Sequence, residues 1–288
     1  MTSIDTIIAY LEYLVQNGLA LHSVKNHLCV LNHFFCIYGW PIVALRSRKV
    51  ALFCKSVKNN VPVSYKSKGV FTIDMIKTLM LKTRSISNAV TFRAIFLFAF
   101  YGFFRLASLV PSAVSKFDNL RFPIVQDVIW ASPGIQFILK TAKNIQGASE
   151  YKIIQIPKIS NPLLCPVTAI QTMLRNLSLT STDPLFVSHP STKTPLTAYE
   201  VRKVLKSLVC SMGLNSSEFG FHAFRRSGAT YAFECNVPVE NIKVHGHWKS
   251  DAVYTYLQSP QGKFQICFKT PFPSYYSYYY SWAWHFSR

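Results

Sequence analysis

Residues 222–256 read HAFRRSGATYAFECNVPVENIKVHGHWKSDAVYTY, and this stretch decides the fold because it sets four side chains at fixed offsets. His222 and Arg225 lie three positions apart in a segment with helical patterning, so both leave the same helix face and can converge on one anion. His247 and Tyr256 follow, nine residues apart. A hydroxyl nucleophile, two imidazoles and a guanidinium form a combination suited to phosphoryl transfer.

The segment after His247 predicts which tyrosine can reach such a site. Ser250-Asp251 is a helix start signal, so we expect a short helix that carries Tyr256 on its second turn. Tyr254 is the alternative. Residues two apart lie on nearly opposite faces of a helix, so only one of these tyrosines can enter the site, and the nine-residue offset favours Tyr256.

This spacing resembles the tyrosine recombinase (phage-integrase-like) family, whose second signature box is His-x-x-Arg, then Gly-His-x, then a Tyr nine residues after that His. The matching residues, one for one, are His222, Arg225, Gly246, His247 and Tyr256. The resemblance covers about residues 3–258. It implies a mainly α fold with a small antiparallel β-sheet (α+β), in which an N-terminal helical core-binding domain precedes the catalytic domain.

The first signature box of the family is an Arg that follows a Gly-containing turn at the end of an apolar helix. The segment AFYGFFRLASLV, residues 99–110, offers Arg105. Ser108 stands where the family usually has an acidic residue, which weakens the support of the Arg but leaves the Arg in place. In the second box Arg226 is the alternative to Arg225, but on a helix it points about 100° away, so we expect it to contact the DNA backbone.

The remaining family catalyst is a Lys in a β-hairpin between the two boxes. The segment IQFILKTAKNIQGASEYKIIQIP, residues 135–157, offers Lys140 and Lys143. We favour Lys143, because AKNIQ is similar to the turn of eukaryotic transposon-borne members and LCPVTAIQ, residues 164–171, resembles their following helix. Lys140 stays open as the alternative.

Tyrosine needs help to attack a phosphodiester at neutral pH, since its ordinary pKa is about 10. His222 is the candidate general base toward Tyr256. Arg105 and Arg225 can each bind two non-bridging phosphate oxygens with a planar fork and neutralise the charge of the transition state. The resemblance then implies an enzyme, a tyrosine site-specific recombinase or integrase that cleaves and rejoins DNA strands through a 3′-phosphotyrosyl intermediate.

The family resemblance assigns Lys143 as general acid to the departing 5′ oxygen and His247 as hydrogen-bond donor to the phosphate. Because the phosphotyrosyl link stores the bond energy, neither ATP nor a metal is needed, and no cofactor is expected. The pair of histidines at 245 and 247 does not indicate a metal site, since residues i and i+2 do not share a helix face. Two alternatives stay open: a decayed or domesticated relative that binds DNA without cutting it, and a type IB topoisomerase.

The charge of the chain indicates a polyanionic partner. Its 288 residues carry 31 Lys and Arg against 12 Asp and Glu, a formal net charge of +19. A basic excess of this size is the electrostatic footprint of nucleic-acid binding, although a basic protein without such a partner is the plain alternative. We expect double-stranded DNA as the partner, with self-assembly on it from dimer to tetramer.

The seven cysteines are widely spaced and form no Cys-x-x-Cys pair, which predicts buried thiols in a reducing compartment rather than disulfides or a zinc site. The strongest apolar run, residues 94–104, is too short to span a bilayer. We therefore expect a soluble intracellular protein without membrane contact, in the nucleus if the host is eukaryotic and otherwise in the cytoplasm.

The order of sequence signals predicts four segments. They are a helical DNA-clamping (core-binding) domain at 1–58, a linker at 59–70, a catalytic domain at 71–260, and an aromatic tail at 261–288 that either docks on a partner or does not fold. Helices are predicted behind Ser3, over 23–38 and 42–57, behind Thr72, from about Asn88, from Pro166 and behind Thr197, and β-strands are predicted near 121–130, 135–141 and 151–157.

Overall fold

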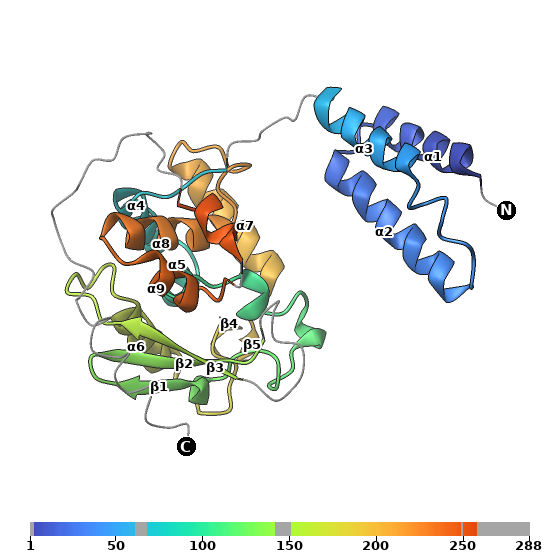
Figure 1. The fold of residues 1–288 in the computed structure, drawn as a ribbon. Coiled ribbons are helices and arrows are strands. Elements are labelled where there is room, and N and C mark those ends of the chain that lie inside the picture. The colour runs from blue at the N-terminus through green and yellow to red at the C-terminus, as the bar shows by residue number, and fades with distance from the viewer. Residues whose placement is uncertain (1–2, 61–67, 142–150, 249, 258–288) are drawn as a thin grey trace, which may run out of the picture. The chain divides into compact units, whose positions relative to one another are not determined.

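The computed structural model of the chain describes residues 3–60, 68–141, 151–248 and 250–257. The chain divides into two compact units, residues 1–66 and 67–288, and Figure 1 labels their helices and strands. Each unit has a hydrophobic core of its own. The mainly α fold with a small antiparallel sheet is the one that the sequence predicted.

The first unit consists of three helices, α1 (Ile4–Gln16), α2 (Leu21–Ile37) and α3 (Arg48–Asn60). Its core is formed by apolar residues from all three helices and from the segment before α3, among them Leu11, Val24, Phe35, Leu45 and Val50. The predicted start of the third helix at residue 42 was wrong. The segment after it forms turns, and the hydroxyl of Ser47 accepts a hydrogen bond from the backbone N–H of Val50, so α3 begins six residues later.

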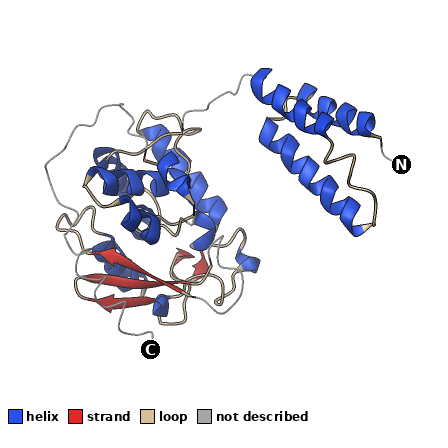
Figure 2. Ribbon diagram, viewed as in Figure 1, coloured by secondary structure: helices blue, strands red, loops and turns tan. Residues whose placement is uncertain are grey.

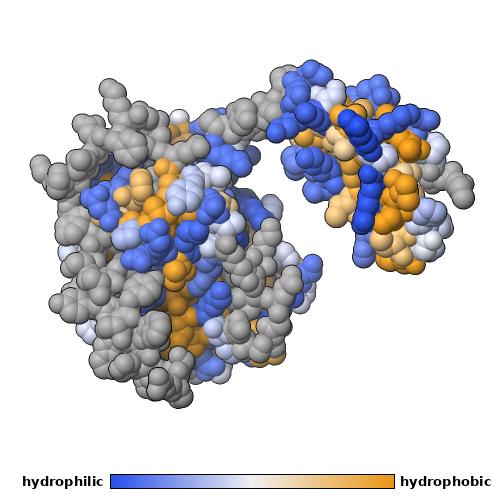
Figure 3. Space-filling model, viewed as in Figure 1, coloured by the Kyte–Doolittle hydropathy of each residue, from blue (hydrophilic) through white to orange (hydrophobic). Residues whose placement is uncertain are grey.

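The first unit also exposes aromatic side chains. At the end of α2 the rings of Phe34 and Tyr38 stack at 6.3 Å, and the ring of Tyr38 stacks on that of Trp40 at 5.3 Å. All three side chains are about half exposed or more. Figure 3 shows orange apolar surface beside blue hydrophilic surface on this unit.

The second unit is built around α5 (Ala89–Tyr101), a helix that is buried on nearly all sides and apolar throughout most of its length. It contacts α6 (Pro166–Leu177), α8 (His222–Glu234) and the third strand of the sheet. The remaining helices are α4 (Ile73–Lys82), α7 (Ala198–Ser211) and α9 (Val239–His245). Thr72, Pro166 and Thr197 begin α4, α6 and α7 as predicted, and Thr197 with Glu200 forms the expected capping box.

The main sheet has three antiparallel strands in the order β1 (Val128–Ala131), β2 (Gly134–Leu139) and β3 (Lys152–Pro157), drawn in red in Figure 2. Alternate side chains of β2 and β3 enter the core. The predicted first strand begins too early. Residues 125–127 instead form a 3-10 turn, because the carboxylate of Asp127 accepts a hydrogen bond from the backbone of Ile124. A second pair, β4 (Val187–His189) and β5 (Thr194–Pro195), had not been predicted.

The residues that open the second unit are fixed to it by hydrogen bonds. The N–H of Gly69 donates to the carbonyl of Glu218 (3.1 Å), and the N–H of Phe71 donates to the hydroxyl of Ser227 (2.7 Å). Helix α3 reaches Asn60, two residues into the predicted linker. The rest of that linker up to residue 67, and the aromatic tail at 261–288, lie outside the described residues.

Among the cysteines that the structure describes, the prediction that the thiols are buried was wrong for all but one. Cys165 is buried, but Cys29, Cys36 and Cys210 are exposed. Cys29 and Cys36 are seven residues apart on α2, hence on one outward face of that helix. In the described ranges no helix is both long enough and apolar enough to cross a membrane.

Candidate active site

The turn after α5 presents Arg105. Helix α5 ends at Tyr101, Gly102 follows as its C-cap, and Phe103 takes a positive φ of 51°, which reverses the chain direction. Arg105 follows two residues later in extended conformation (φ −85°, ψ 145°), at the position that the sequence predicted. The side chain is half-buried, and it makes no hydrogen bond to any other residue in the described part of the chain.

Helix α8 brings Arg225 to the same turn because a glycine allows close approach. A Cβ on Gly228 would lie 2.0 Å from the carbonyl oxygen of Phe100, so only glycine lets α8 pack against the end of α5. Arg225, one turn earlier on α8, is 3% exposed. Its guanidinium donates to the carbonyl of Phe103 and, at 2.6 Å, to the carbonyl of Gly246.

An indole ring completes the surroundings of Arg225. The guanidinium carbon lies 3.9 Å from the ring centre of Trp248, a cation–π contact in a dry environment. Burial, and next the charge of Arg105, lower the pKa of Arg225, although a guanidinium stays protonated in proteins. Its Nε donor is buried and has no acceptor among the residues that the structure describes. Such a donor is costly to leave unpaired and is suited to an incoming anion.

A tight turn at residues 245–248 places Trp248 over Arg225. His245 is buried, and its Nε2 donates to the carbonyl of Tyr101 (2.8 Å), which ties the turn to the end of α5. A Cβ on Gly246 would lie 1.7 Å from the indole of Trp248, so the ring can fold back only over a glycine. His247 has φ 53°, and burial, followed by the charge of Lys152, lowers its pKa to about 4.

Tyr256 enters the site from a single 3-10 turn, Asp251–Thr255. Ser250 caps this turn as predicted, but Tyr256 is the residue that follows it, not a residue of its second turn. The hydroxyl of Thr230 on α8 holds the carbonyl of Tyr256 at 2.7 Å. The phenolic oxygen of Tyr256 lies 2.9 Å from Nε2 of His222, whereas Tyr254 is 54% exposed.

His222 is held neutral by its surroundings. Burial, followed by the charges of four cations, lowers its pKa to about 4; the cations are Arg225, Arg226, Arg105 and Lys68. At neutral pH its Nε2 can therefore accept the phenolic proton of Tyr256. Arg226 is not turned away from the site as expected. It donates to the carbonyl of Gly69 (3.0 Å), and its guanidinium lies 5.9 Å from the ring centre of Tyr256.

Of the two lysine candidates, the structure describes Lys140 alone. Lys140 forms a buried ion pair with Asp127 at 2.6 Å and donates to the carbonyl of Asn119 (2.7 Å). These contacts occupy its ammonium group and give it a structural role. Lys143 lies outside the described residues. Ser108, which takes the place of the usual acidic residue, is buried in the 3-10 turn Leu106–Ser108 after Arg105.

The structure therefore brings together five of the six residues that the sequence singled out for the site, and these are Arg105, His222, Arg225, His247 and Tyr256. It adds three whose part was not foreseen. Trp248 covers Arg225, His245 anchors the turn, and Arg226 flanks the tyrosine. The sequence did hold one sign of the roles of Trp248 and His245: aromatic and imidazole side chains lie close together around Gly246.

The amino-acid sequence matches no protein-family model and no curated protein. The fold does match solved structures. The structure of a lambda integrase dimer bound to a COC′ core site has a TM-score of 0.61 at 15% identity, and the match covers 92% of this chain and 67% of that one.

Two further solved structures match this fold. The Tn1549 transposon integrase in complex with circular intermediate DNA has a TM-score of 0.57 at 11% identity, covering 92% of this chain and 83% of that one. The XerH site-specific recombinase bound to its difH substrate has a TM-score of 0.55 at 12% identity, covering 90% and 68%. At these identities the likeness establishes the fold, and this chain has the tyrosine recombinase fold.

Proposed function

We propose that this chain cleaves and rejoins DNA strands through a 3′-phosphotyrosyl intermediate, as a site-specific recombinase or integrase. The observation that carries the proposal is the 2.9 Å contact between Tyr256 and the neutral imidazole of His222, beside the buried cation of Arg225. A hydroxyl, a base and a fixed positive charge within one small region are the requirements for attack on a phosphodiester.

The attack uses the groups as follows. Nε2 of His222 takes the proton of the phenol as the oxygen of Tyr256 bonds to phosphorus. The bond from phosphorus to the 5′ oxygen breaks, and the phosphate remains on the tyrosine. Arg105 and Arg225 neutralise the non-bridging oxygens, whose charge grows in the transition state. Rejoining reverses these steps with the 5′ hydroxyl of the same or another strand.

The departing 5′ oxygen needs a proton. We assign this role to Lys143, and the hydrogen bond from His247 to the phosphate completes the set. Lys140 is the weaker candidate, because its ammonium is engaged by Asp127 inside the protein. Double-stranded DNA is the substrate in this proposal, and two to four copies of the chain assemble on it. A mobile element would encode the protein. It would act in the nucleus if the host is a eukaryote and otherwise in the cytoplasm.

Ser108 favours a second candidate, a decayed relative that binds DNA without cutting it. An acidic residue at this position would support the neighbouring Arg105, and a serine does so less. A type IB topoisomerase is the third candidate, since it uses the same covalent chemistry without joining new partners.

One experiment separates the three. The protein is incubated with a pool of duplexes of randomised sequence, each nicked just 3′ of the tested phosphate so that the short 5′-hydroxyl fragment diffuses away. We expect a covalent protein–DNA adduct that a Tyr256→Phe variant does not form. Binding without an adduct would favour the decayed relative. Relaxation of supercoiled plasmid without joining of separate duplexes would favour the topoisomerase.

A further inference from the structure

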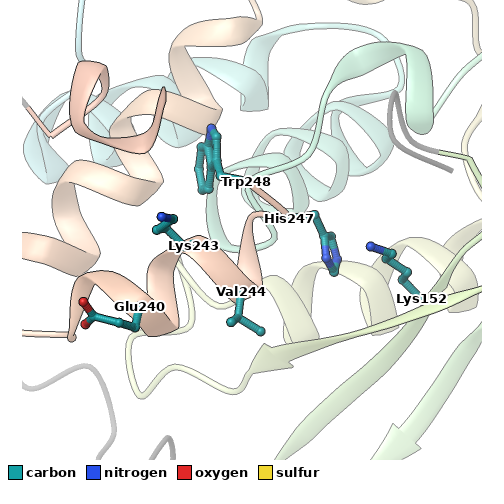
Figure 4. A pocket seen from close by; sticks show the side chains of 6 residues that line it. All are labelled: Lys152, Glu240, Lys243, Val244, His247 and Trp248. Carbon is teal, nitrogen blue, oxygen red and sulfur yellow. The ribbon is translucent and has the colours of Figure 1, made fainter. Parts of the chain in front are cut away.

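A hollow of about 400 Å³ adjoins the candidate active site at His247. It is lined by Glu240, Lys243 and Val244 of α9 and by Trp248 (Figure 4). Lys152, the first residue of β3, faces α9 across the hollow. Its volume falls within the roughly 300–1,000 Å³ of ordinary ligand sites, so it can accept part of a ligand.

The two lysines that line the hollow differ in whether a carboxylate compensates their charge. Lys243 is bound to the carboxylate of Asp251 at 3.0 Å, so its charge is largely compensated. The ammonium group of Lys152 makes no ion pair or hydrogen bond with another residue in the ranges that the structure covers. In Figure 4 the ammonium of Lys152 points toward the ring of His247. The carboxylate of Glu240 lies at the opposite end of the hollow. The end next to His247 is therefore positively charged.

His247 is part of the candidate active site and also lines the hollow. In the proposed function it donates to the phosphate under attack, and it also lines the hollow beside Lys152. A ligand group in the hollow would thus lie immediately next to that phosphate. On a DNA strand the neighbouring group of suitable charge is the adjacent phosphodiester. An ammonium group is a common ligand for such a phosphate.

We infer that the hollow is a second phosphate site, in which Lys152 binds the phosphodiester next to the one attacked by Tyr256. This inference rests on the proposed function, because it takes DNA as the substrate. Lys152 fixes the register of the strand, and it takes no part in proton transfer. Its loss should therefore weaken binding of the duplex and leave the rate at saturation nearly unchanged.

The test uses nicked duplexes recovered as adducts, because the covalent link fixes the position of the attacked phosphate. We expect Lys152→Ala to raise the duplex concentration for half-maximal adduct formation about tenfold. The variant should also lower the slope of log affinity against log salt by about 0.9, the value for one lost phosphate contact. Lys152→Arg should stay close to wild type. Lys158→Ala, an exposed lysine just beyond the other end of β3, is the matched control.

A methylphosphonate scan locates the contact. An uncharged linkage next to the attacked phosphate should weaken wild-type binding as much as Lys152→Ala does, and it should cost that variant nothing further. If Lys152→Ala behaves like Lys158→Ala, the phosphate site is refuted while the function stands. If it slows only the saturated rate, and a 5′-bridging phosphorothiolate restores that rate, Lys152 is a proton donor and the inference is also wrong. If the wild-type protein forms no adduct, the proposed function fails and the inference with it.

Discussion

Replacing Trp248 tests whether the site depends on the ring face that covers Arg225. The guanidinium lies 3.9 Å from the ring centre in a buried setting. A desolvated cation–π contact is worth about 2 kcal/mol, which corresponds to about 30-fold in rate if the contact holds Arg225 in its reactive position. Trp248→Leu should therefore lower the single-turnover rate of adduct formation by about 30-fold and change DNA affinity far less.

Trp248→Phe is the matched control. The indole N–H makes no hydrogen bond to a described residue, so phenylalanine loses no bond and keeps an aromatic face. We expect it to lose less than about fivefold in rate, since phenylalanine is a weaker cation–π partner than tryptophan. Melting temperatures recorded for both variants separate a misplaced Arg225 from an unfolded protein. Equal losses in the Leu and Phe variants, with equal melting temperatures, would show that ring volume matters and the π face does not.

Three further predictions concern the tyrosines and histidines of the site. Tyr256→Phe should abolish the adduct while Tyr254→Phe keeps it, measured on the same nicked duplexes; the reverse pattern would contradict the 2.9 Å contact with His222. Because the pKa of His222 is lowered to about 4, the second-order rate of adduct formation should stay flat as pH falls through 6.5 and drop only near 4. A midpoint near 6.5 would disprove a base that its surroundings hold neutral. His245, whose pKa is also lowered to about 4, binds no proton in the folded state between pH 6.5 and 4 while the unfolded chain does. This residue alone should therefore lower the free energy of unfolding by about 3 kcal/mol as the pH falls across that window, and His245→Asn should lose that share of the pH dependence in denaturant titrations.

Local sequence signals located most of the helices because those signals act over a few residues. Ser3, Thr72 and Thr197 cap helices through their own hydroxyls, and each helix begins where the hydroxyl requires. The start of α3 was misplaced because residues 42–47 are also compatible with a helix, and a packed turn containing the buried Leu45 was preferred. The first strand was misplaced because residues 125–127 form a 3-10 turn. The carboxylate of Asp127 holds this turn by accepting the backbone N–H of Ile124, and it also pairs with Lys140 just after the end of β2.

In the site as well, the sequence predicted contacts that follow from spacing along one segment, and it missed contacts that depend on where a separate segment lies. The offsets within residues 222–256 predicted that His222 and Tyr256 would meet, and they do. Helical geometry alone turned Arg226 away from Arg225, but it could not show that Tyr256 arrives from a separate turn on the side of Arg226. The stacking of Trp248 on Arg225 depends on a positive φ at His247 and on the lack of a side chain at Gly246, a combination that periodicity does not encode.

The electrostatics of the site argue for an anionic ligand independently of any motif. Every charged group that shifts the pKa of His222 is a cation, and the set spans the first box, α8 and the chain just before α4. Arg225 is buried against carbonyl oxygens and an indole ring rather than a carboxylate. Clustered like charges repel, so the fold bears this arrangement at a cost to its stability. A phosphodiester between Arg105 and Arg225 would supply the missing negative charge, and DNA should therefore raise the melting temperature of the protein more than it raises that of Arg225→Ala.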